Sequence, residues 1–160
     1  MALQKNLHRV EAALGRLGRI GSSPKGDADR CERAGVTPIP PVGQRILRHV
    51  VERGPARISE IARATRTGDA AVSRQVTQLE AQGLLRRESD ERDGRAALVT
   101  GTEVGRGISD SLRAAADEIF QERLAGWGNG QLETLAEGME RLADDLSDPV
   151  RDARESKAGR

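Results

Sequence analysis

The stretch VSRQVTQLEAQGLLRRESDERDGRAALVT, residues 72–100, decides the fold of this 160-residue chain. Its first part repeats apolar side chains at i, i+4 and i+7, through Val72, Val76 and Leu79, which predicts an amphipathic helix. Gly83 follows where a helix is expected to end, because glycine readily adopts the left-handed conformation found at helix C-termini.

A β-hairpin is predicted directly after this helix. Leu84 and Leu85 begin an extended run, Asp93-Gly94 is a dipeptide typical of tight hairpin turns, and residues 96–100 form the returning strand. A helix followed by an arginine-bearing hairpin is typical of a winged helix, which places the helix in a DNA groove and the hairpin alongside it. The fold class predicted is mostly α with a small β-hairpin wing: a winged helix-turn-helix DNA-binding lobe plus a helical dimerisation region.

Two apolar seams flank this lobe at the ends of the chain. In each seam the apolar residues are spaced alternately by three and four, which is an a/d pattern suited to packing along another helix. We expect both seams to be buried against a second copy of the chain; packing on each other within one chain is the alternative. The seams are Leu3, Leu7, Val10, Leu14 and Leu17, and Leu132, Leu135, Met139, Leu142 and Leu146.

Helix-breaking residues divide the chain. Prolines at 38, 40 and 41 mark one boundary, and glycines around Trp127 mark a break between two long C-terminal helices. The expected segments are an N-terminal helical dimerisation segment at 1–36, the winged helix-turn-helix lobe at 37–101, C-terminal dimerisation helices at 102–147 and a disordered tail at 148–160. The shorter helices are expected at 27–34, from Val42 to Gly54, and from Ser59 to about Thr65, and Thr102 is expected to cap a long helix.

Composition excludes several classes of protein. The net charge of +1 gives no general attraction to phosphate, so DNA affinity must come from a local patch, and 1% aromatic residues argue against a base-stacking platform. The single cysteine excludes an intrachain disulfide, and with no membrane-spanning run or secretory leader the protein is expected to be cytoplasmic. No nucleophile–base arrangement, phosphate loop or metal-ligand cluster is present, so we expect no enzyme, no cofactor and no metal site.

The outward face of the predicted helix carries the expected DNA contacts. With Val72 turned inward, the 3.6-residue period turns Arg74 outward, where a guanidinium can bind a phosphate or a guanine edge. An arginine at the hairpin tip can enter the minor groove, and an aspartate at its base can hold the loop. We expect DNA contacts from Ala70, Ser73, Arg74, Thr77, Gln78, Arg92 and Arg95, and support of the wing from Asp90 and Gly94.

From about Pro41 to Leu146 the chain resembles the MarR family of transcriptional regulators. The resemblance implies a homodimer with intertwined terminal helices whose two winged helices read a near-palindromic operator. Many members are repressors released by a small aromatic or anionic molecule. The residues that carry the resemblance are Ser59-Glu60-Ile61-Ala62, Val72-Ser73-Arg74, Leu79-Glu80-Ala81-Gln82-Gly83-Leu84, Asp90-x-Arg92-Asp93-Gly94-Arg95 and Thr102-x-x-Gly105-Arg106.

The chain also departs from the family pattern. Arg66 replaces a glycine in the turn before the predicted helix, where a non-glycine residue in the left-handed conformation costs about 1–2 kcal/mol. Gly101 replaces an apolar residue before the long helix, which is expected to weaken that junction. Cys31 is expected in an irregular stretch beside arginines, and because some relatives sense oxidants through an N-terminal cysteine, a redox-responsive regulator is one alternative.

A ligand cleft is a further expectation from the resemblance. Trp127, at the break between the long helices, either lines such a cleft or fills the helix junction. The candidate cleft residues are Arg16, Arg19, His49, Leu112, Phe120 and Trp127. The rival function is a winged helix that binds a protein and has no operator. In a DNA-binding protein, Arg74, Arg92 and Arg95 should project together without acidic partners.

Overall fold

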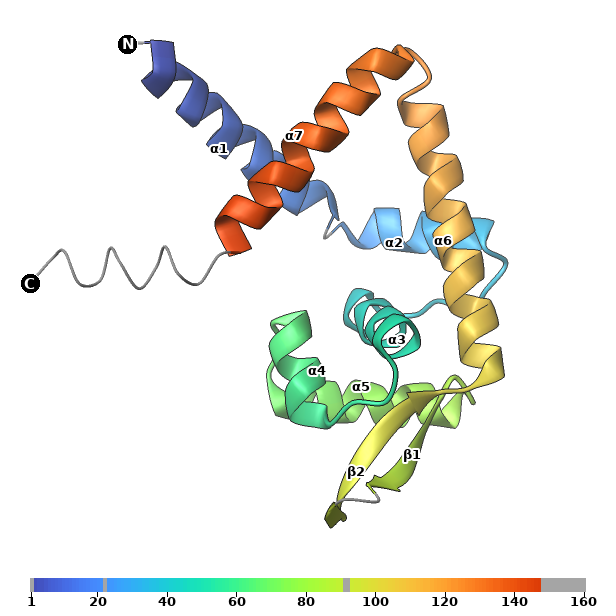
Figure 1. The fold of residues 1–160 in the computed structure, drawn as a ribbon. Coiled ribbons are helices and arrows are strands. Elements are labelled where there is room, and N and C mark those ends of the chain that lie inside the picture. Colours follow the sequence, from blue (N-terminus) through green and yellow to red (C-terminus); the bar gives the residue numbers. More distant parts are fainter. Residues whose placement is uncertain (1, 22, 91–92, 148–160) are drawn as a thin grey trace, which may run out of the picture. The chain divides into compact units, whose positions relative to one another are not determined.

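A computed structural model describes residues 2–21, 23–90 and 93–147 of the chain (Figure 1). The chain is helical apart from a two-stranded antiparallel hairpin, which confirms the predicted mostly α fold with a small β wing. The elements are α1 (Ala2–Gly21), α2 (Pro24–Arg33), α3 (Pro41–Arg53), α4 (Ile58–Thr65), α5 (Asp69–Ala81), β1 (Leu85–Asp90), β2 (Asp93–Gly101), α6 (Glu103–Arg123) and α7 (Asn129–Ser147).

The chain divides into two compact units, Met1–Ile119 and Phe120–Arg160. The first unit contains α1 to α5, the hairpin and most of α6, and the second contains the end of α6 and all of α7. The predicted division into segments 1–36, 37–101, 102–147 and 148–160 stays a prediction.

Proline sets the start of two helices. α2 begins at Pro24 rather than at the predicted Asp27, and α3 begins at Pro41. Proline is favoured in the first turn of a helix, because the N–H that it lacks would have no helical partner there. Cys31 lies within α2, as the helix expected at 27–34 implies and not in an irregular stretch, and it is 2% exposed.

An aliphatic core joins the elements of the winged helix. α3 contacts α4, α5 and β2, and α5 contacts α4 and β1; Figure 1 shows these helices gathered beside the hairpin. Val72, Val76 and Leu79 are all buried in this core, as the helical period predicted. Ala62 is buried in the same cluster as Val72, as expected where two helices cross.

The turn from α4 to α5 adopts a left-handed conformation at a residue other than glycine. Arg66 has φ 50° and ψ 45° and is the sole non-glycine residue with positive φ in the described part of the chain. The N–H of Thr67 donates to the carbonyl of Ala62 at 2.9 Å, which closes the end of α4. The turn therefore forms with a residue that is strained in the left-handed region.

Two glycines allow close contacts around the start of α6. A Cβ on Gly105 would overlap the backbone oxygen of Leu84, so α6 packs directly on the chain that leaves α5. Thr102 caps α6 as predicted: its Oγ1 accepts the N–H of Gly105 at 2.9 Å. Gly101 is buried, and a Cβ there would lie 3.2 Å from Cγ2 of Val51. The missing side chain at this position thus permits close packing on α3.

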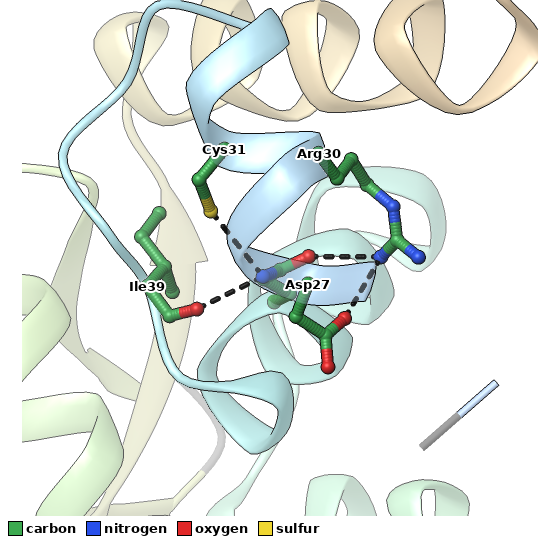
Figure 2. Close-up of polar contacts among 5 residues, drawn as sticks. Asp27, Arg30, Cys31 and Ile39 are labelled. Carbon is green, nitrogen blue, oxygen red and sulfur yellow. Dashed lines mark hydrogen bonds and ion pairs between the residues drawn. The ribbon is translucent and has the colours of Figure 1, made fainter. Parts of the chain in front are cut away.

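A buried polar cluster joins α2 to α3 (Figure 2). Nε2 of Gln44 donates to the carbonyl of Ile39 at 2.9 Å and to Sγ of Cys31 at 3.5 Å, while Oε1 accepts from Nη1 of Arg30 at 3.0 Å. Arg30 also pairs with Asp27 at 3.2 Å. Since both ends of the Gln44 amide are bonded, this side chain connects α2, the following loop and α3.

The two apolar seams lie on exposed helix surfaces. On α1 the seam side chains are 39% to 74% exposed, with Leu14 the least and Leu3 the most exposed. On α7, Leu135, Met139 and Leu146 are 40%, 47% and 71% exposed. Rows of large apolar side chains in water are unfavourable on a soluble protein, so these faces need a covering surface.

Candidate nucleic-acid interface

The outward face of α5 presents the side chains that the helical period predicted. Ala70, Arg74, Thr77 and Gln78 are exposed and Ser73 is half-buried. Among the described residues, Arg74 makes no hydrogen bond or ion pair, so its guanidinium is available to a phosphate or a base edge.

Two other polar groups of this face are bonded within the protein. Oγ1 of Thr77 donates to the carbonyl of Ser73 at 3.1 Å, and Oε1 of Gln78 accepts from Nε2 of Gln75 at 2.8 Å. Arg74 is therefore the cation of this helix face that no bond to another described residue holds back from DNA.

The hairpin is anchored at its base. β1 and β2 pair in antiparallel register from Leu85↔Gly101 to Ser89↔Ala97, and the register shifts between Ser89 and Asp90. Leu85 and Val99 are buried, and Val99 also bridges to Ala56 in the chain before α4. This anchoring holds the wing on the same core that carries α5.

Several predicted wing residues lie beyond what the structure describes. Arg92 lies outside the described residues, and so do the side chains of Asp90 and Arg95 and the surroundings of Gly94. Their assignment to DNA contact and wing support stays a prediction from the sequence.

Sequence reasoning missed an arginine that connects the hairpin to α5. Nη1 of Arg87 lies 2.6 Å from Oε2 of Glu80, and its Nη2 donates to Oγ1 of Thr77 at 3.4 Å. The signal was present: strand side chains alternate, so Arg87 lies on the same face as buried Leu85, two residues before it.

The predicted ligand-cleft residues are spread over both units. Leu112 is 7% exposed and belongs to the core, while His49 on α3 is half-buried. Arg16 and Arg19 are exposed on α1. In the second unit, Phe120 and Trp127 are 64% and 45% exposed. The cleft itself stays a prediction.

The described residues include neither a metal-ligand group nor a membrane-spanning helix. Within the described ranges, no three His, Cys, Asp or Glu side chains are grouped so that they could hold a metal ion. Nor does any helix described here combine the length and apolar character needed to cross a membrane. Cys31 is buried in the single chain, unlike the accessible thiols that react readily with oxidants.

Sequence comparison connects the winged-helix region to known regulators. A family profile described as MarR family matches residues 39–96, which cover α3 to α5 and part of the hairpin. A curated relative from Bacillus subtilis (strain 168), the uncharacterized HTH-type transcriptional regulator YxaD, is 33% identical over 97 residues. That alignment covers 61% of this chain and 68% of the relative.

Solved structures share the fold over most of their length. A probable transcriptional regulator from Pseudomonas aeruginosa is 28% identical with a TM-score of 0.63, and the match covers 83% of this chain and 96% of that one. BpsR from Bordetella bronchiseptica is 19% identical with a TM-score of 0.62, over 84% of this chain and 98% of its own. The likeness to BpsR is one of fold.

Proposed function

The chain belongs to the MarR family of transcriptional regulators, and from that premise we propose that it is a homodimeric repressor of a near-palindromic DNA operator. The observation that carries this proposal is the exposed guanidinium of Arg74 on α5, which has no hydrogen-bond or ion-pair partner among the described residues. In a helix-turn-helix protein the second helix enters the major groove, and its outward side chains meet the base edges. Ala70, Ser73, Thr77 and Gln78 are the proposed neighbours of Arg74 at that surface.

A two-fold dimer would present two such helices to one DNA duplex. The exposed seams of α1 and α7 support dimerisation, because a two-fold interface pairs the same apolar surface from each copy. A dimer with two equivalent reading helices requires two equivalent half-sites, which is why a near-palindromic operator is proposed.

The DNA proposal is tested by selection. Wild-type protein is used to select duplexes from a random-sequence library, and affinity for the selected duplex is compared with that for a scrambled duplex. We expect a recurring near-palindrome, and Arg74→Ala should weaken binding to it by about 1–3 kcal/mol if Arg74 contacts a base. Arg113→Ala removes an exposed arginine outside α5 and the hairpin and should bind as wild type does. Failure of the wild-type protein to enrich any sequence would contradict the proposal.

The wing arginines are proposed to add contacts beside the reading helix. Arg92 and Arg95 flank the predicted turn of the hairpin, where a guanidinium suits the narrow minor groove. Arg92→Ala should lower affinity for the selected duplex by about 1–3 kcal/mol. Unchanged affinity in a folded Arg92→Ala variant would show that this residue is not a DNA contact.

We also propose that a small aromatic acid weakens operator binding. The DNA binding of BpsR, which shares this fold, is regulated by 6-hydroxynicotinic acid. Arg16, Arg19 and His49 are the proposed partners of the acid group, and Phe120 and Trp127 the proposed aromatic contacts. A ligand can act only by preferring one of two conformations, and 1.4 kcal/mol of preference changes operator affinity about tenfold.

The test uses a panel of aromatic acids that includes 6-hydroxynicotinic acid. Because Trp127 is the sole tryptophan, its fluorescence can be followed in the same titration as operator binding. An active compound should change both signals over one concentration range. If the whole panel leaves both signals flat, the proposed ligand class is wrong, and Trp127 is better explained as filling the helix junction.

A further inference from the structure

Two neighbouring arginines on β1 have different partners. Nη2 of Arg86 lies 2.6 Å from Oε1 of Glu88, so that ion pair stays on one strand. Arg87 points to the other face of the strand, where Nη1 lies 2.6 Å from Oε2 of Glu80 on α5. The alternation of side chains along a strand thus directs Arg87 to the helix.

Arg87 holds α5 at two points. Thr77 and Glu80 are three residues apart and so lie on the same face of the helix. The planar guanidinium offers separate N–H groups in a fixed fork, and Nη1 reaches Glu80 while Nη2 reaches Thr77. The Thr77 hydroxyl donates to the carbonyl of Ser73, so its lone pairs are available to accept from Arg87. A two-point attachment restricts the direction of β1 relative to α5.

The charge arrangement does not favour Arg87 as a phosphate ligand. Glu80 neutralises it at close range, whereas Arg74 has no acidic partner in the described residues. A carboxylate beside a DNA-binding surface repels phosphates, so Glu80 by itself would weaken binding. Its presence is explained if it holds Arg87.

We infer that Arg87 is a positioning residue: through Glu80 and Thr77 it sets the geometry between the wing and the reading helix, without contacting DNA. This inference rests on the proposed function of α5. A site that must match two grooves at once loses specificity when its supporting contacts loosen. The expected signature is a loss of discrimination between DNA sequences rather than a uniform loss of affinity.

The experiment compares Arg87→Ala, Arg87→Lys, Glu80→Gln and the double variant Arg87→Ala/Glu80→Gln with Arg86→Ala as the matched control. The first readout is the affinity ratio between the duplex selected by wild-type protein and a scrambled duplex, at several salt concentrations. The second is amide hydrogen exchange of strand residues 85–89 and 97–101 in protein without DNA, with α3 as the internal reference.

If Arg87 positions the wing, Arg87→Ala and Glu80→Gln each lower the affinity ratio about tenfold, the size expected for one charge-assisted hydrogen bond. The double variant should lower it no further, because both changes break one contact. Arg87→Lys should keep the salt dependence of binding but still lower the affinity ratio. A lysine ammonium lacks the planar, forked N–H groups with which the guanidinium reaches Glu80 and Thr77 together. Hairpin exchange should accelerate in these variants while α3 is unchanged. Arg86→Ala should match wild type in the ratio.

Two results would overturn the inference. The first is a Glu80→Gln protein with an unchanged ratio beside an Arg87→Ala protein whose salt slope falls by about one, the mark of a phosphate contact. The second is hairpin exchange that stays at the wild-type rate in both single variants. If wild-type protein selects no duplex, the proposed function fails, yet hydrogen exchange still decides whether Arg87 anchors the hairpin to α5.

Discussion

Among the described glycines, Gly105 is the one at which an added methyl group would clash most severely. An added Cβ would overlap the carbonyl oxygen of Leu84, and backbone atoms cannot move aside as a flexible side chain can. Gly105→Ala should therefore lower the free energy of unfolding by about 3 kcal/mol, at the upper end for overpacking. Urea unfolding followed by circular dichroism measures this change.

Gly107, one half-turn later in α6, supplies the matched control. A Cβ there would meet no atom within 4 Å, and the residue is exposed. Alanine is a better helix former than glycine, so Gly107→Ala should raise the free energy of unfolding by about 0.5–1 kcal/mol. Equal effects from the two alanines would contradict the close packing at Gly105.

Replacing Arg66 with glycine, which the family favours in this turn, should stabilise the protein. The left-handed conformation of Arg66 costs about 1–2 kcal/mol, and glycine removes that cost while adding flexibility to the unfolded chain. Arg66→Gly should therefore be about 0.5–1 kcal/mol more stable to urea than wild type. Arg66→Ala keeps the strain and serves as the control; a gain of the same size from alanine would show that conformation is not the cause.

At this scale the sequence predicted inner and outer faces better than individual contacts. The helical period places three apolar side chains on one face of α5, and that face is buried. They are Val72, Val76 and Leu79, and their spacing is visible in the sequence. The bonds of Arg87 and Gln44 were not predicted. The periodic pattern gives the face on which a side chain such as Arg87 lies, but the bonds also depend on which rotamers reach a partner on another element.

Among the elements, α2 is connected to α3 through the buried side chain of Gln44. Gln44 bonds Arg30 and Cys31 of α2 and the carbonyl of Ile39, all in a buried position. Gln44→Ala removes these bonds, leaving Arg30 with Asp27 as its partner, and should cost about 1–3 kcal/mol of unfolding free energy. Amide exchange should also accelerate in α2 more than in α5.

Lys25→Ala is the control for this prediction, because Lys25 is exposed on α2 and Ala is a good helix former. It should leave both the unfolding free energy and the exchange of α2 close to wild type. If Gln44→Ala destabilises the protein but α2 and α5 lose protection equally, Gln44 is a general core residue and not a specific connection.

Element types were predictable from the sequence, and their ends less so. Glycine and threonine signals placed the end of α5 and the cap of α6 correctly, because each relies on local backbone chemistry: Gly83 has φ +72°, and Thr102 accepts the N–H of Gly105. The helix predicted at 27–34 begins three residues earlier, at Pro24, because proline is favoured in the first turn of a helix.

For the whole molecule, the a/d spacing on α1 and α7 predicts apolar seams and favours a second copy of the chain as the surface that covers them. These seams are exposed in the single chain. Leu7, in the seam of α1, is 57% exposed. An interface between two copies buries residues that are exposed in each copy alone, so the burial pattern of one chain does not reveal it. The homodimer is therefore a prediction that solution measurements must decide.

The dimer prediction can be tested at one position of α1. Sedimentation at micromolar concentration should give twice the mass of one chain for wild type. Leu7→Glu places a charge in each copy of the seam, and loss of two buried leucines at about 1.5–3 kcal/mol each should raise the dissociation constant more than a hundredfold. Ala12→Glu adds the same charge at an exposed position half a turn around α1, about 180° from the seam centre, and should stay dimeric. A wild-type monomer with full helicity would contradict both the homodimer and the near-palindromic operator. A Leu7→Glu protein as dimeric as Ala12→Glu would instead place the interface away from α1, leaving the seam of α7 to form it.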